Sequence, residues 1–259
     1  MRMNKFDILT KYISMIQTDS FGELVIDKEN DGTPEQIRLE SVKSKYMTKA
    51  IIFDLDGLLI DSEIISYKIY KEILCKFGYE FSKEDYAQNY SGKTEISNVT
   101  NLIDKYNLPW TVELGLSKVL EIENKFLAQG VELKPGSRDL LAYLKENCFK
   151  IAIASSSAEE RALSILKQHN IIDCFDEFVF GHEVKKGKPN PDIFLKACEK
   201  ISERPQECLV LEDSEAGIQA AFFANIPVIC IPYMKVPNQH YLNMTKAILN
   251  SLDEVISYL

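Results

Sequence analysis

The sequence is poor in the residues that build zinc sites and disulfide frameworks. It has only three histidines, which lie far apart in the chain, and this argues against a histidine-rich zinc site. None of its cysteines belongs to a Cys-x-x-Cys pair; they are Cys75, Cys148, Cys174, Cys198, Cys208 and Cys230. Scattered cysteines of this kind are typical of reduced thiols, so we expect free, mostly buried cysteines in a cytoplasmic protein.

Positive charge and long apolar runs are also scarce. The formal net charge is −9, which argues against nucleic acid as a general partner. No apolar run approaches the ~18 residues of a membrane-spanning helix, and residues 1–7 lack the apolar stretch of a signal peptide. Apolar residues nevertheless make up 46% of the 259 residues, enough for a sizeable core in one or two domains. We expect a monomer without a nucleic-acid or membrane partner.

A short apolar run at residues 50–53 ends in two acidic residues, and it organises the rest of the chain. The run predicts a buried strand. Asp54 and Asp56 follow it, and because side chains alternate along an extended segment, both can point to one site. Two carboxylates in one site need a cation or a shared proton, which favours a divalent ion with oxygen ligands, most simply Mg²⁺. The alternative is that this stretch, which continues with Gly57, is only a turn.

Three stretches with different patterns predict the domain organisation. Residues 1–48 form an N-terminal extension, with an amphipathic helix over 6–16 and strands at 23–27 and 36–39. Residues 64–133 carry only helical patterns, with helices expected at 64–77, 82–90, 95–106 and 112–129. This insert could be a lid over the site or an ordinary helical subdomain. Residues 49–63 and 134–259 then form the α/β core.

Beyond residue 134 helices and strands alternate, which predicts a doubly wound parallel sheet with helices on both faces. The expected helices are at 138–147, 158–169, 192–200 and 215–224, and the expected strands at 149–154, 175–180, 208–211 and 227–231. Ligands of such a sheet bind at the carboxyl ends of its strands. The polar residues directly after each strand are therefore candidates for a site.

Two of these candidates suit a phosphate group. Ser155 follows the strand at 149–154, where it could bind phosphate oxygens or cap the next helix. Lys188 is restrained by Pro189, which suits it to hold a phosphate or a carboxylate. Lys185 and Lys186 lack this restraint, and we expect them to be solvated.

The last candidates are acidic. Glu212 and Asp213 end the strand at 208–211, and they would complete the oxygen ligands of the cation that the first acidic pair requires. The alternative is that Asp213 or Ser214 caps the following helix.

Together these clusters resemble the four motifs of the haloacid dehalogenase (HAD) superfamily. In chain order the motifs are Asp54-x-Asp56-Gly57-x-x-x-Asp61-Ser62, Ser155, Lys188-Pro189-x-Pro191-Asp192 and Glu212-Asp213-Ser214-x-x-Gly217. The similarity runs from residue 49 to the carboxyl end, and residues 64–133 resemble the C1-type helical cap of the family. The chain looks most like the β-phosphoglucomutase-like phosphatases.

The resemblance implies a Mg²⁺-dependent phosphatase acting on a small phosphorylated metabolite, either a sugar phosphate or a nucleotide-type monophosphate. Asp54 would attack phosphorus and form an aspartyl-phosphate. Asp56 would protonate the leaving oxygen and then activate water. Asp54, the backbone carbonyl of Asp56 and Asp213 would hold Mg²⁺, with Glu212 nearby.

The resemblance also implies how the phosphoryl group is bound. Ser155 and Lys188 would bind its oxygens, and Lys188 would keep the nucleophile ionised. Further substrate contacts are expected from the same motifs and from the cap, at Gly57, Ser156, Asn190 and Lys93. Lys93 could equally be a solvated loop lysine.

The chain differs from the motif pattern of sugar-phosphate mutases at two cap positions, and these differences help to decide between a phosphatase and a mutase. Sugar-phosphate mutases of this subgroup have a cap histidine where this chain has Ser66, and a cap arginine where it has Glu95. A mutase must grip a second phosphate, which Glu95 would repel, so hydrolysis is favoured over a phosphohexomutase. Asp56 argues against dehalogenation, because it supplies the acid that a leaving alcohol needs. A non-catalytic binding protein is a third hypothesis, against which stands the complete set of motif residues.

Overall fold

The computed structural model describes residues 17–18, 24–25 and 48–259. The chain divides into two units, Met1–Met47 and Thr48–Leu259. In the first, β1 (Gln17–Thr18) pairs antiparallel with β2 (Leu24–Val25), which lies within the strand expected at 23–27. The helix expected over 6–16 and the strand expected at 36–39 lie outside the described residues.

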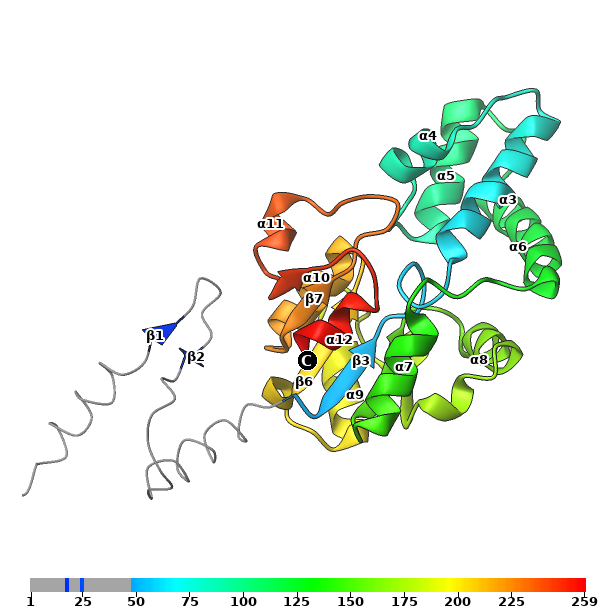
Figure 1. Ribbon diagram of the computed structural model, residues 1–259. Coiled ribbons are helices and arrows are strands. Elements are labelled where there is room, and N and C mark those ends of the chain that lie inside the picture. The colour runs from blue at the N-terminus through cyan, green and yellow to red at the C-terminus, as the bar shows by residue number, and fades with distance from the viewer. Residues whose placement is uncertain (1–16, 19–23, 26–47) are drawn as a thin grey trace, which may run out of the picture. The chain divides into compact units, whose positions relative to one another are not determined.

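The second unit is built on a six-stranded sheet in which every pairing is parallel. The strands stand in the order β5-β4-β3-β6-β7-β8, with β3 (Ala50–Phe53) inside the sheet (Figure 1). The other strands are β4 (Lys150–Ser155), β5 (Glu177–Phe180), β6 (Cys208–Glu212), β7 (Val228–Cys230) and β8 (Ala247–Ile248). The predicted doubly wound α/β sheet is thus confirmed.

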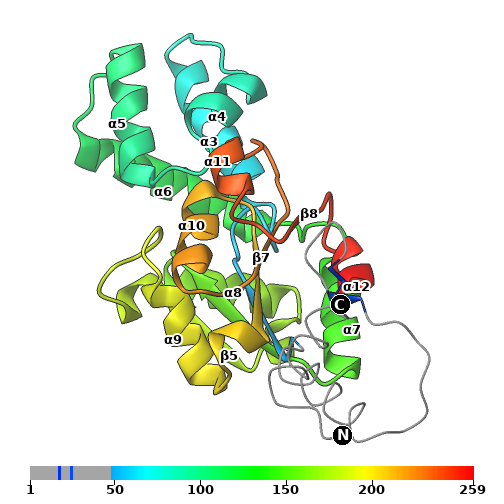
Figure 2. The same cartoon turned by 90° about the vertical axis from the view of Figure 1, so that its left-hand side faces the viewer.

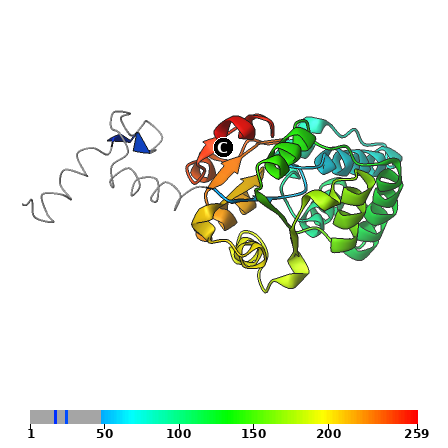
Figure 3. The ribbon, with the colours of Figure 1, turned by 60° about the horizontal axis from the view of Figure 1, so that its bottom comes forward.

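The strands bury both faces, which explains their nearly continuous apolar sequences. On one face, Ile51 and Phe53 belong to an apolar cluster that includes residues of α7 (Ser137–Glu146), α8 (Glu159–Gln168) and α12 (Glu254–Tyr258). On the other, Ile52 packs in a cluster with residues of α9 (Asp192–Ile201) and α10 (Glu215–Phe223). Figures 2 and 3 show these helices as two layers with the sheet between them.

Four helices between β3 and β4 gather at one end of the sheet (Figure 1). They are α3 (Ser62–Lys76), α4 (Lys83–Asn89), α5 (Glu95–Tyr106) and α6 (Val112–Gln129). Ser82, Thr94 and Thr111 cap the last three by accepting a backbone N–H bond, so the chain starts each helix where a hydroxyl can satisfy it. No strand lies between residues 62 and 133 of the described chain, as expected.

The carboxyl-terminal stretch differs from the prediction. It forms α11 (Gln239–Leu242), β8 and α12, none of which the sequence pattern indicated. These elements have only four, two and five residues, too few for a periodic pattern to be recognised. Three short 3₁₀ turns were also missed, at Ile172–Cys174, Gly181–Glu183 and Pro205–Glu207.

The expectation about thiols holds only in part. The cysteines are free, and Cys198, Cys208 and Cys230 are buried. Cys75 and Cys148, in and just after helices α3 and α7, are exposed because they lie near helix ends at the surface. Within the part of the chain that the structure describes, no helix combines the length and apolar character needed to cross a bilayer.

Candidate active site

The register of the central strands brings the predicted polar clusters together. Phe53 of β3 lies opposite Ile153 of β4 and Leu211 of β6. The residues that follow these three positions therefore reach the carboxyl edge of the sheet at nearly the same level, as parallel pairing requires. Asp54 and Glu212 come directly after Phe53 and Leu211, on neighbouring strands.

Lys188 joins these two carboxylates. Its ammonium donates to Asp54 Oδ1 and, at 2.7 Å, to Glu212 Oε1. The side chains are almost excluded from solvent, with exposed fractions of 7% for Lys188 and 0% for Glu212. Burial alone would lower the pKa of Lys188, but the two carboxylates raise it above its usual value and keep the ammonium charged.

The ionisation of Asp54 is balanced rather than fixed. Burial and the charge of Glu212 raise the pKa of Asp54 to about 7, against the opposing effect of Lys188. Lys188 acts in the expected direction, since its charge lowers the pKa of Asp54. A single buried ammonium faces two buried carboxylates, so the group carries a net negative charge when both are ionised. A second cation would therefore be needed to hold Asp54 fully ionised at neutral pH.

Asp213 provides the place for such a cation. Asp54, Glu212 and Asp213 each offer an oxygen within 4.8 Å of the others. Asp213 Oδ1 is buried and has no hydrogen-bond partner. Burial, followed by the charges of Glu212 and Asp54, raises the pKa of Asp213 well above its usual range. A buried carboxylate oxygen without a partner, beside two other carboxylates, fits a metal ion with oxygen ligands.

Glu212 accepts hydrogen bonds on both of its carboxylate oxygens, and its role as a metal ligand stays a prediction. Its Oε2 accepts bonds of 2.9 Å from the backbone N–H groups of Asp213 and Ser214 and from the Ser214 hydroxyl, while its Oε1 accepts from Lys188. Through these bonds Glu212 braces the loop around the cluster, while its Oε1, which accepts the bond from Lys188, keeps a second lone pair. Ser214 caps α10 by accepting from the Gly217 N–H at 3.1 Å, so the capping alternative holds for Ser214.

Gly57 shapes the cluster through its backbone. Its φ is +83°, and a Cβ at this position would lie 2.3 Å from Asp213 Oδ2. Any side chain would be strained in this conformation and would collide with the carboxylate, so only glycine fits. The Gly57 N–H donates to the Ile60 carbonyl at 3.0 Å.

The carboxyl group of Asp56 is held away from the metal cluster. Its Oδ2 accepts from the Ser157 hydroxyl, and its Oδ1 accepts from Arg161 Nη1 at 2.9 Å. Burial acts to raise the pKa of Asp56, but Arg161 and Ser157 prevail and lower it. Sequence reasoning missed Ser157 and Arg161. The only signal was that both lie just beyond Ser155, in the turn and first helical residues after a strand end.

The remaining predicted residues lie in different settings. Ser155 is buried and its hydroxyl accepts from the Ser157 N–H at 3.0 Å, so it does not cap α8, whose N-cap is Ala158. Ser156 is exposed. Lys93 is exposed and donates to the Asn89 carbonyl at 2.7 Å, as a solvated loop lysine would.

The loop before α9 separates its lysines as predicted. Lys185 and Lys186 are exposed, whereas Lys188 enters the site. The Asn190 amide donates to the Gly187 carbonyl at 3.1 Å, so its side chain stabilises the turn that presents Lys188.

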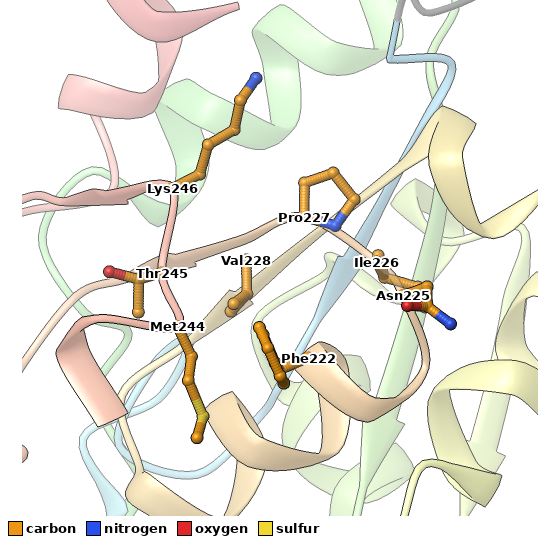
Figure 4. Close-up of a pocket in the computed structure, with 8 residues that line it drawn as sticks. All are labelled: Phe222, Asn225, Ile226, Pro227, Val228, Met244, Thr245 and Lys246. Carbon is orange, nitrogen blue, oxygen red and sulfur yellow. The ribbon is translucent and has the colours of Figure 1, made fainter. Parts of the chain in front are cut away.

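A separate pocket lies beside the start of β7, between the end of α10 and the residues that precede β8. Its volume is about 400 Å³, and its lining includes Phe222, Val228 and Met244 (Figure 4). Its lining residues include none of the charged residues of the candidate site.

Comparison with known proteins agrees with this geometry. The sequence model of the haloacid dehalogenase-like hydrolase family matches residues 51–231 of the chain. The chain belongs to this family. The matched stretch begins at β3 and ends just after β7, so it contains the whole candidate site of this HAD protein.

Two curated relatives of the HAD chain are named as phosphatases. A bifunctional riboflavin kinase/FMN phosphatase from Arabidopsis thaliana is 34% identical over 218 residues, covering 83% of this chain and 54% of that protein. The chain thus spans about half the length of that relative. A phosphorylated carbohydrates phosphatase from Thermotoga maritima is 32% identical over 203 residues, covering 78% of this chain and 91% of that protein.

A solved structure shows the same fold. The β-phosphoglucomutase from Clostridium difficile superimposes with a TM-score of 0.64 at 25% identity, covering 81% of this chain and 93% of that one. The resemblance to the HAD superfamily and its β-phosphoglucomutase-like members is confirmed.

Proposed function

We propose that this HAD protein is a Mg²⁺-dependent phosphatase that hydrolyses a small phosphorylated metabolite through an aspartyl-phosphate. Its family and its phosphatase relatives make it a phosphoric monoester hydrolase. The proposal adds the cation, the intermediate and the roles of individual residues. One observation carries it: Lys188 bridges Asp54 and Glu212 at the sheet edge, beside the unpartnered oxygen of Asp213.

In the first half of the proposed reaction Asp54 attacks phosphorus. A new bond forms between an Asp54 oxygen and phosphorus while the bond from phosphorus to the leaving oxygen breaks. Lys188 already contacts Asp54, so it lies where it can also bind a phosphoryl oxygen. Placing positive charge beside the phosphoryl oxygens is the main task of a protein in phosphoryl transfer.

Asp56 serves both halves of the proposed reaction. In the first it gives a proton to the leaving oxygen, and in the second it takes a proton from the water that attacks the aspartyl-phosphate. The bonds from Ser157 and Arg161 favour its carboxylate, which is the form that activates water. Asp56 must therefore take up a proton before it can act as the acid.

The residues present fit a bound Mg²⁺. Asp54 and Asp213 would hold it through carboxylate oxygens, and we retain the Asp56 backbone carbonyl as a further ligand. Glu212 would support the site through the loop that it braces. The bound ion would supply charge that offsets the repulsion between a carboxylate nucleophile and a phosphate anion.

The helices α3–α6 are proposed to be the cap that selects the substrate. Glu95 and Glu123 belong to this segment and, with Arg161, interact electrostatically near Asp56. Glu123 is paired with Arg161, so the Glu95 carboxylate is the group that would disfavour a second phosphate on the substrate. A monophosphate of a sugar or a nucleotide-type compound is therefore favoured over a bisphosphate. This also places simple hydrolysis ahead of the phosphohexomutase alternative.

Replacing the nucleophile tests the proposal. The variant Asp54→Asn should lose phosphate release from p-nitrophenyl phosphate with Mg²⁺ by about 10³-fold or more, since an amide cannot form the acyl-phosphate. Asp139→Asn, at an exposed position of α7, is the matched control and should keep full activity. Unchanged turnover in Asp54→Asn would refute the proposed chemistry. A screen of phosphorylated metabolites would identify the substrate, and isomerisation of β-glucose 1-phosphate without phosphate release would favour the mutase.

A further inference from the structure

Arg161 lies where the helical segment meets the candidate active site. Its Nε donates to Glu123 Oε1 at 2.9 Å, and its Nη1 donates to Asp56 Oδ1 and to the Ser157 hydroxyl, both at 2.9 Å. Only 18% of the Arg161 side chain is exposed. A single guanidinium thus touches a carboxylate of the helices α3–α6 and the carboxylate that we assign to proton transfer.

The three partners come from distant parts of the chain. Glu123 lies on α6, Arg161 on α8, and Asp56 directly after β3, so Arg161 is separated by 38 residues from Glu123 and by 105 from Asp56. A guanidinium is planar and presents its N–H groups in fixed directions. Nε and Nη1 are bonded at the same time. The position of the Glu123 carboxylate therefore restricts the orientation of the guanidinium plane, and with it the direction in which Nη1 points at Asp56.

The orientation of Asp56 depends on this arrangement. Its Oδ1 is held by Arg161, and its Oδ2 by Ser157, whose hydroxyl is itself bonded to Arg161. Without Arg161, the Asp56 carboxyl group would lose its bond to the rigid, charged guanidinium and would keep the rotatable hydroxyls of Ser157 and Ser62. Lys188 contacts Asp54 and Glu212 instead, so the two buried cations serve different carboxylates of the site.

We propose that Arg161 is a positioning residue. The contacts from Glu123 through Arg161 to Asp56 link the position of helix α6 to the orientation of the Asp56 carboxyl group. The proposal rests on the proposed function. It concerns the step in which Asp56 gives its proton to the leaving oxygen as that oxygen separates from phosphorus. Glu123 acts only through Arg161, and Arg161 only through Asp56.

The test compares two kinds of leaving group. An alkoxide leaves poorly and needs the acid, whereas p-nitrophenolate leaves without help, so misplacing the acid should slow alkyl phosphates selectively. The value of kcat/KM reports the first phosphoryl transfer and excludes the later hydrolysis of the intermediate. A change that only loosened the fold would slow both substrates by the same factor.

The variants preserve charge where possible. Arg161→Lys keeps a cation beside Asp56 but removes the planar pair of donors. We expect it to lower kcat/KM for the sugar monophosphate that the wild-type protein hydrolyses fastest by about 10–100-fold, and for p-nitrophenyl phosphate by less than about 3-fold. Glu123→Gln should show the same selectivity at about 3–10-fold, and the double variant should be no slower than Arg161→Lys because the residues act in series.

Glu121→Gln is the matched control on the same helix. Among the described residues, Glu121 bonds to Lys118 and Lys125 of α6, on an exposed face. Glu121→Gln should therefore change neither rate. Equal slowing of both substrates, or effects that add in the double variant, would overturn the role of Arg161. Such results would leave the phosphatase proposal intact, because that proposal is tested separately by the activity of Asp54→Asn.

Discussion

The carboxyl edge of the sheet and the helices α3–α6 differ in how their acidic groups are balanced. At the sheet edge, Asp54 and Glu212 share a buried cation from the same α/β core, Lys188. In the helices, Glu63 has a buried Oε2 without a partner, and Glu123 takes its cation from α8 of the core. The buried Asp54 and Glu212 of the sheet edge thus share a cation of their own core, whereas the half-buried Glu123 of the helices takes its cation from outside them.

The apolar interiors of the two regions differ as well. The sheet buries mainly aliphatic side chains, whereas α3 and α4 enclose an aromatic group formed by Tyr67, Tyr70, Phe81, Tyr86 and Tyr90. Aromatic rings fill irregular space with few rotatable bonds. The comparison shows that the strands position the charged residues of the candidate site, whereas the helices α3–α6 are held together by packed aromatic rings.

Removing Lys188 should have the largest effect. In Lys188→Ala two buried carboxylates lose their cation, so we expect phosphatase activity to fall by about 10³-fold and the free energy of unfolding to fall by about 3–5 kcal/mol. Steady-state kinetics and urea unfolding would measure both. Lys186→Ala, two residues away and exposed, should change neither. If both variants kept activity, the sheet edge would not be the catalytic region.

The pH dependence should respond to Mg²⁺. The proposed nucleophile, Asp54, must be ionised to attack phosphorus. Without metal the pKa of Asp54 is about 7, so activity should rise with pH through that value when Mg²⁺ is limiting. Bound Mg²⁺ competes with the proton and should move the acidic midpoint to lower pH. Profiles of kcat/KM at several Mg²⁺ concentrations would show the movement. A midpoint that does not respond to Mg²⁺ would count against Asp54 as a ligand.

Asp213→Asn should separate stability from function. The folded-state pKa of Asp213 is raised by burial and by neighbouring carboxylates, so its ionised form costs stability at pH values above its ordinary pKa. In EDTA at pH 7.5 the variant should therefore melt a few degrees higher than the wild type. Its melting temperature should no longer rise on adding Mg²⁺, whereas that of the wild type should. A lower melting temperature in EDTA would contradict this account.

Within the helices, Asp85 should matter for stability alone. Burial acts to raise its pKa, but bonds from Lys105, Asn89 and Tyr106 lower it, so its contribution is present above pH ~4 and is lost as the pH falls further. Asp85→Asn should cost about 0.5–1 kcal/mol at pH 7, and the difference from the wild type should shrink as the pH falls through the lowered pKa of Asp85.

Two measurements complete that prediction. Glu72→Gln, which breaks an exposed pair with Lys76 on α3, should have almost no effect on the free energy of unfolding. Neither substitution should change kcat, since neither residue contacts the sheet edge. A loss of kcat in Asp85→Asn would instead give the helical segment a direct role in the chemistry.

Much of the fold follows from local sequence patterns. The bounds of α5 and α6 agree with the predicted 95–106 and 112–129, because long periodic segments with hydroxyl caps define their own ends. The candidate site was also predictable in outline. Asp54, Lys188 and Asp213 each follow or precede a strand or helix that the sequence marks, and parallel strands deliver them to one edge.

The sequence by itself determined which residues end the strands, because period and apolar runs are local properties. Only the tertiary structure decided that both Glu212 oxygens are already bonded, that Asp213 Oδ1 is left without a partner, and that Arg161 joins Glu123 to Asp56. Arg161 is separated by 38 residues from Glu123 and by 105 from Asp56, so a local sequence pattern cannot predict these pairs. The physical reason is that a long charged side chain takes its partners from packing, whereas a strand takes its position from its own sequence.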